Sequence, residues 1–189
     1  MKFYANCREL PIHNFIEISR TGDLKFLFYD YKNVSDESIN SDVQNAYIDI
    51  IDELNTLFKG SRNEKLTKEA KLQAISIKFM NLSILEMVVT VSGKTDEALE
   101  LAKKMRVNID NISTYKKAVN NELRKLEKQL QSNNEEKPEN GTDNWEKSLI
   151  LVKENGFNFD RYTTPIIEFI YALNRLEEKA EHIKNLKTK

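Results

Sequence analysis

The sequence predicts an all-α fold, a helical bundle of about five to seven helices with a long central helix. Two observations predict this class. Only five glycines and three prolines occur in 189 residues while 31% of the residues are charged, which suits long helices and not β-sandwiches or glycine-rich nucleotide loops. Apolar residues also recur every three or four positions over most of the chain, which is the spacing of one helix face.

The N-terminal segment, residues 1–31, is rich in aromatic side chains. Pro11 suits the first turn of a helix and Thr21-Gly22 is typical of a helix end, so one helix is expected between them. A second, shorter turn is expected at 24–29. Because residues 1–31 hold seven of the seventeen aromatic residues, this segment is not expected to be a solvated tail.

Three helices are expected in the next part of the chain. Apolar residues between Ile39 and Leu57 are three or four positions apart, which predicts an amphipathic helix. A longer helix is predicted from about 64 to 92, and its apolar residues, Met87 among them, cover so much of its circumference that it is expected to be the central helix. Thr95-Asp96 then begin a short helix that ends near Met105.

A coiled-coil-type helix is predicted near 111–131, because its apolar residues form a narrow seam. Such a seam packs on one partner helix, from this chain or from another. The polar, turn-rich stretch 132–142 is predicted to be an exposed linker or loop. Two more helices follow, so the expected organisation is a helical bundle over 1–131, the linker, and a C-terminal helical pair over 143–189.

No pattern in the sequence indicates catalysis. It contains no glycine-rich phosphate loop, zinc-binding pattern or nucleophile elbow, and no carboxylate is predicted to have a shifted pKa. Glu178 and His182 come nearest to a metal-binding pair, but they occur once and favour a solvated helix surface. The single cysteine, Cys7, is expected to be buried or inert. We therefore expect a protein that is not an enzyme and has no cofactor and no metal.

The charge balance gives no general attraction to nucleic acid or to anionic membranes, because the net charge is -1. Glu86 and Thr90 interrupt the longest apolar stretches, which fall short of the roughly 20 residues that a membrane-spanning helix needs. The N-terminus lacks the apolar run of a signal peptide. No membrane partner is expected, and the protein is expected to stay where it is made.

Acidic and basic residues are nevertheless segregated along the chain. Residues 30–59 contain seven acids and two bases, whereas 103–128 contain eight bases and three acids. Three interpretations are open: these helices face water or steer packing within the chain, their faces are complementary between neighbouring subunits, or the basic face contacts phosphates. The candidate basic face consists of Lys103, Lys104, Arg106, Lys116, Lys117, Arg124 and Lys125.

The opening segment also carries a recognisable pattern. Glu9–Ile18 contains Leu-Pro followed by an aromatic-bearing helix, and 21–27 contain Gly-Asp followed by an aromatic-Leu pair. This pattern, together with Tyr47-Ile48-Asp49 in the later acidic helix, resembles small helical virion proteins of Bacteroidetes phages, including crAss-like phages. The resemblance covers about 50 residues well, and the rest of the chain only as a succession of helices.

The resemblance implies a structural phage virion protein, such as a head–tail connector, ring or adaptor subunit, that is made in the host cytoplasm. Its implied partners are the portal, neighbouring ring or tail proteins and further copies of itself, with nucleic acid contacted only through the basic face. Aromatic side chains are then candidate anchors on a neighbouring subunit. The candidates are Phe3, Tyr4, Phe28, Tyr29 and Tyr31, whereas Phe15 and Phe26 fit a core position at least equally well.

Two other functions share the predicted fold. The first is a nucleic-acid-associated helical regulator that uses the basic region 103–128. The second is a phage assembly chaperone that is absent from the mature particle. A regulator is distinguished by salt-dependent DNA binding, and a chaperone by its absence from purified particles.

Overall fold

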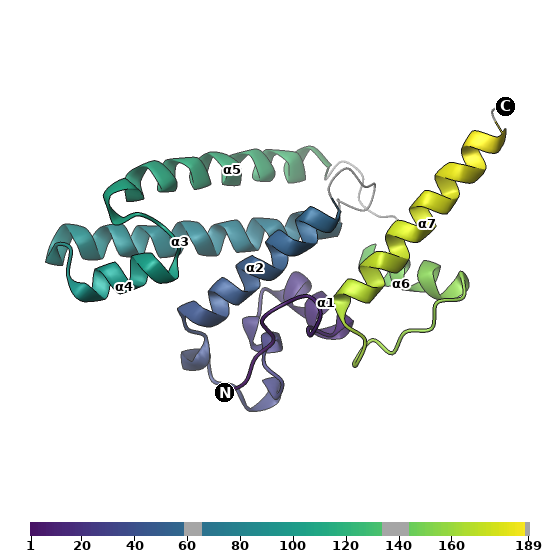
Figure 1. The fold of residues 1–189 in the computed structure, drawn as a ribbon, viewed down its shortest axis with the longest axis horizontal. Coiled ribbons are helices and arrows are strands. Elements are labelled where there is room, and N and C mark those ends of the chain that lie inside the picture. Colours follow the sequence, from purple (N-terminus) through teal and green to yellow (C-terminus); the bar gives the residue numbers. More distant parts are fainter. Residues whose placement is uncertain (59–65, 134–143, 188–189) are drawn as a thin grey trace.

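The computed structural model describes residues 1–58, 66–133 and 144–187, and within them it confirms the all-α fold (Figure 1). Seven α-helices lie in these ranges, with short 3-10 turns between α1 and α2 and between α4 and α5, and no strand is found there beyond isolated bridges. The helices are α1 (Ile12–Thr21), α2 (Ser41–Leu57), α3 (Lys68–Ser92), α4 (Asp96–Lys104), α5 (Ile112–Asn133), α6 (Asn144–Glu154) and α7 (Ile166–Lys187). The 3-10 turns are η1 (Leu24–Leu27), η2 (Tyr31–Asn33), η3 (Asp36–Ser38) and η5 (Ile109–Asn111).

The helix ends follow the capping residues in the sequence. Gly22, with a φ of 74°, ends α1, and its amide donates to the carbonyl oxygen of Ile18 at 2.7 Å. The hydroxyl of Thr95 accepts a hydrogen bond from the amide of Ala98 and caps α4 as predicted. Asn40 caps α2, so this helix begins two residues later than the apolar pattern from Ile39 suggested. Of the predicted linker, 134–142 lie outside the described residues.

The first hydrophobic cluster is built from elements that are far apart in the sequence. The ring of Trp145 in α6 packs against two phenylalanine rings. The distance between ring centroids is 5.1 Å to Phe15 of α1 and 6.2 Å to Phe169 of α7. The backbone joins the same elements, because the amide of Ile12 donates to Thr164 at 3.0 Å. The α6–α7 pair therefore covers α1, and the packing groups the helices differently from the predicted division into 1–131 and 143–189.

The second hydrophobic cluster lies between α3, α4 and α5. The seam of α5 that resembles a coiled coil packs on α3 of the same chain, and the two helices run antiparallel (Figure 1). Their direction is marked by two ion pairs, Lys71–Glu122 at one end and Glu86–Lys116 at the other. The buried members of this cluster are Ile75, Leu82, Leu85, Ala98, Ala102, Ile112, Val119 and Leu126.

Helix α3 joins the two clusters, and the sequence interpretation of this helix needs two corrections. By length and composition alone it is apolar enough to cross a membrane, because an apolar window tolerates up to two charged residues, and of the two interruptions, Glu86 and Thr90, only Glu86 is charged. Only 22% of that window is buried inside the structure. Met87, which was assigned to the widened apolar stripe of a central helix, is 60% exposed. One face of α3 is thus left uncovered by the described residues.

Candidate functional site

The aromatic N-terminal segment is folded back on itself and does not form a set of free anchors. Phe28 is only 2% exposed, so its assignment as an exposed anchor is wrong. Its ring packs edge-on against Phe3 at 5.9 Å, and an isolated bridge joins the backbones of these two residues. The reason is a long-range pairing of residues 2–4 with 27–29, in which the amide of Tyr4 donates to Leu27 at 2.8 Å.

The remaining aromatic candidates are partly engaged within the chain. The rings of Tyr4 and Tyr29 stack at 4.1 Å, and burial raises the pKa of the Tyr4 hydroxyl. Tyr31 lies on the ring of Phe26 at 4.7 Å. Among the five candidates only Tyr29, at 45% exposure, offers a large free surface, while Phe3, Tyr4 and Tyr31 are half-buried.

The acidic helix α2 and the end of α4 are held together by their opposite charges. The guanidinium of Arg106 donates to both carboxylate oxygens of Asp49 at 2.9 Å, and Lys104 pairs with Asp42 at 3.5 Å. The side chain of Asn45 adds a hydrogen bond to the carbonyl of Lys104 at 3.2 Å. For these residues the segregated charges steer packing within the chain, which was the first of the three interpretations.

Arg106 occupies a backbone conformation that favours glycine. It has a φ of 56° and is the single non-glycine residue with positive φ in the described ranges. Helix α4 ends at this residue, because the amide of Val107 donates a hydrogen bond to the carbonyl oxygen of Ala102 at 3.0 Å. This conformation costs a non-glycine residue about 1 kcal/mol. Its bidentate ion pair with Asp49 offsets part of this cost, although an exposed pair contributes less than about 1 kcal/mol.

Two substitutions separate the strain from the ion pair. Arg106→Gly and Arg106→Ala both remove the ion pair, but only glycine relieves the left-handed backbone. We expect the glycine variant to be more stable than the alanine variant by about 1 kcal/mol, as measured by urea unfolding. Equal midpoints for the two variants would show that the backbone at this position is not strained.

An open cleft lies beside this ion pair, where α2, α3, α5 and the end of α4 meet. Its walls include Asp49 and Asp52 of α2, Lys78 of α3 and Tyr115 of α5. Burial raises the pKa of Asp52, whereas the nearby Lys78 opposes the shift. The expectation that no carboxylate has a shifted pKa is therefore wrong for Asp52, because residues of other helices cover it. Among the described residues, the cleft lining contains no histidine, cysteine or serine.

The raised pKa of Asp52 predicts a pH-dependent effect of Asp52→Asn. Between its ordinary pKa of 3.8 and the raised folded value, the folded state binds the proton more readily than the unfolded state. The stability contributed by this proton is therefore lost as the pH rises through that window. We expect Asp52→Asn to increase the free energy of unfolding at pH 7 and to have little effect below pH 3.8. Asp49→Asn, which breaks the Arg106 pair, is the control and is expected to give no increase.

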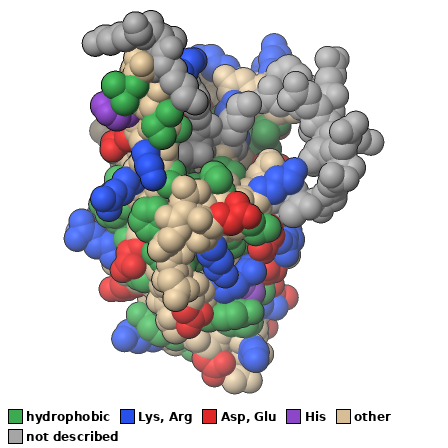
Figure 2. Space-filling model, turned by 90° about the vertical axis from the view of Figure 1, so that its right-hand side faces the viewer, with side chains coloured by type: hydrophobic (Ala, Val, Ile, Leu, Met, Phe, Trp, Pro, Cys, Tyr) green, Lys and Arg blue, Asp and Glu red, His purple; other side chains and the backbone are tan. Residues whose placement is uncertain are grey.

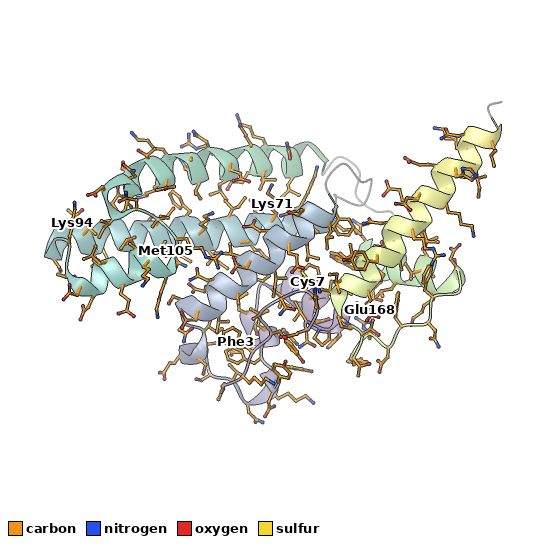
Figure 3. The ribbon with its side chains drawn as sticks, in the orientation of Figure 1. Phe3, Cys7, Lys71, Lys94, Met105 and Glu168 are labelled. Atoms are coloured by element: carbon orange, nitrogen blue, oxygen red, sulfur yellow. The ribbon has the colours of Figure 1, made fainter. Side chains whose placement is uncertain are left out.

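The other groups with possible chemistry are buried or dispersed. Cys7 is fully buried as expected, its thiol donates to the carbonyl of Ile50 at 3.4 Å, and burial raises its pKa (Figure 3). Glu178 and His182 lie on the exposed part of α7. Within the described ranges no group of three or more His, Cys, Asp and Glu side chains is arranged to hold a metal ion.

The candidate basic face is reduced by pairing within the chain. Lys104 and Arg106 contact acids of α2, and the ammonium of Lys116 pairs with Glu86 at 2.7 Å. In the part of the chain that the structure describes, no ion pair is found for the other four members, which are Lys103, Lys117, Arg124 and Lys125.

A line of exposed apolar side chains lies on α3, on the side away from the second cluster. Its central side chains are Met80, Ile84, Met87 and Val91, with exposed fractions of 57%, 47%, 60% and 79%. The half-buried Ile77 continues the same line, with part of its side chain packed against the first cluster. We call these five residues, with Ser76, Ser83 and Thr90 along one edge, the outer face of α3. The 3-4-3-4 spacing from Ile77 to Val91 is visible in the sequence, but of this line only Met87 was considered, and it was placed in the widened apolar stripe of the central helix.

A second exposed apolar region lies at the C-terminal end of α7, which projects from the body (Figure 1). Leu151, Leu176 and Ile183 line an open groove between α6 and α7. Elsewhere on this end of the molecule, acidic and basic side chains are intermixed with hydrophobic ones, and no area of one charge sign dominates (Figure 2).

Comparisons with known proteins give no family assignment, since no family model, curated protein or solved structure matches the chain.

Proposed function

We propose that the protein is a non-enzymatic building block of a multi-subunit assembly and acts through protein–protein contacts. The observation that carries this proposal is the apolar side chains left exposed along α3 and along the projecting end of α7. Contiguous exposed apolar patches on a soluble chain mark interaction sites. The groups that could do chemistry are instead dispersed, paired or buried, as the ion pair of Arg106 and the burial of Cys7 illustrate.

The particular assembly that we propose is a phage virion, in which the chain is a head–tail connector, ring or adaptor subunit. This step follows the resemblance of Glu9–Ile18 and 21–27 to virion proteins of Bacteroidetes phages. Its partners are then the portal, neighbouring ring or tail proteins and further copies of the chain. The protein is made in the host cytoplasm and becomes part of the particle.

Mass spectrometry of purified particles tests this proposal. We expect the chain to be present in a fixed ratio to the portal protein and to remain bound through washes at high salt, because apolar contacts are not screened. Absence from purified particles contradicts the virion role. Absence from particles combined with binding to virion proteins in infected-cell extracts supports the assembly chaperone instead.

A nucleic-acid-associated regulator is the second candidate, and it is favoured by the four basic residues for which the described part of the chain shows no ion pair. Lys117, Arg124 and Lys125 lie on α5, and Lys103 lies on α4. Binding through about four such contacts predicts an affinity for DNA that falls as roughly the third to fourth power of salt concentration. A mobility shift with that salt dependence, lost when the three α5 residues become Gln, supports the regulator. We expect no shift at physiological salt.

A further inference from the structure

We propose that the outer face of α3 pairs with the same face of a second copy of this chain. The proposal rests on the assembly role above, because it names one partner and one surface for it. Over Ile77, Met80, Ile84, Met87 and Val91 the intervals are three and four residues, which is the heptad spacing of helices that pack side by side. The β-branched residues Ile77, Ile84 and Val91 alternate along this line with Met80 and Met87.

The outer face of α3 carries no charge. Between Ser76 and Ser92 the only charged residues are Lys78 and Glu86. Both point away from this face, since Lys78 lines the cleft beside α2 and Glu86 pairs with Lys116 of α5. An uncharged stretch of about five helical turns is unusual on the surface of a chain in which 31% of residues are charged.

The polar side chains at the edge of this face are already hydrogen-bonded to their own helix. The hydroxyls of Ser76, Ser83 and Thr90 donate to the carbonyls of the residues four positions earlier, at 2.8, 2.9 and 2.7 Å. Their hydroxyl protons therefore keep a partner when water leaves. The outer face of α3 can thus be covered without leaving a buried donor unsatisfied.

A second copy is the occupant that these features fit best. In a two-fold pair each residue meets the same surface, and a face without charge brings no like charges together. Two such faces in contact would bury on the order of 1,000 Å², which is at the lower limit for a specific protein interface. A lipid surface fits less well, because helices that lie on membranes carry Lys and Arg along the edges of the apolar face, and Ser76, Ser83 and Thr90 stand there instead.

Sedimentation velocity of the full chain over about 1–100 μM, the range in which a small interface associates, tests the pairing. We expect the wild-type chain to form dimers in this range. In Met87→Lys two ammonium groups are brought into the apolar seam, so association is expected to weaken at least tenfold. Ile150→Lys introduces the same charge at an exposed apolar position of α6 and is expected to associate like the wild type. Circular dichroism verifies that both variants are folded.

Three outcomes overturn the pairing. The first is a wild-type chain that stays monomeric over the whole range, and the second is a dimer that Met87→Lys leaves intact. The third is flotation with neutral phosphatidylcholine vesicles that Met87→Lys abolishes, because the outer face of α3 then binds lipid. Each of these leaves the assembly role to be decided separately by the composition of purified particles.

Discussion

Replacing Phe169 with alanine is expected to lower the free energy of unfolding by about 3–5 kcal/mol. Phe169 is fully buried, and its ring lies 6.2 Å from that of Trp145 and 6.3 Å from that of Phe159. The substitution leaves a cavity where α7 meets the aromatic rings of the first cluster. Because a domain of this size is stabilised by about 5–15 kcal/mol, the loss is a large fraction of the total.

Trp145, the only tryptophan in the chain, reports this change directly in urea unfolding followed by fluorescence. Tyr171→Ala is the matched control, since Tyr171 lies on the same helix and is 52% exposed. It is expected to change stability by less than about 0.5 kcal/mol. A similar small effect for Phe169→Ala would mean that α7 does not pack on the first cluster.

Leu85→Ala is expected to destabilise the second cluster by about 2–5 kcal/mol. Leu85 of α3 is fully buried in the second cluster, to which α4 contributes the small residues Ala98 and Ala102. Among the described residues α3 is the one helix that contributes to both clusters, so we expect the loss to act most strongly on α4 and α5. Amide hydrogen exchange in these helices is expected to become about 10²–10³ times faster, with smaller changes in α1 and α6.

The neighbouring Ile84→Ala is the control for this substitution, measured in dilute protein. Ile84 is adjacent to Leu85 in the sequence but lies on the outer face of α3. Its replacement by alanine therefore removes few contacts in the monomer. Its exchange rates are expected to stay close to those of the wild type. Equal acceleration of α1, α4, α5 and α6 in Leu85→Ala would show that the two clusters open as a single unit.

The sequence was sufficient to predict the features that depend on local patterns. Composition and three-to-four spacing predicted the all-α class, and Gly22 and Thr95 marked helix ends that the structure confirms. The burial of Cys7 was also expected. These features depend on residues within one or two helical turns, where propensity and capping act.

Features that depend on distant segments could not be predicted in the same way. Phe28 is buried because residues 2–4 pack against it. The pKa of Asp52 is raised by burial among helices whose relative positions cannot be derived from the sequence. Periodicity also cannot tell which apolar face of a helix is covered. Met87 was therefore expected in the widened apolar stripe of a central helix, whereas the structure leaves it at the surface.

Thiol labelling of the outer face of α3 tests the central claim most directly. Cys7 is buried, so Met87→Cys introduces one reactive thiol on that face, and Glu100→Cys introduces one on exposed α4. In assembled protein or purified particles we predict that the thiol at position 87 reacts at least tenfold more slowly than in the dilute monomer, while the thiol at position 100 reacts equally fast in both. Unchanged reactivity at position 87 after assembly would contradict an outer face of α3 that is covered by protein.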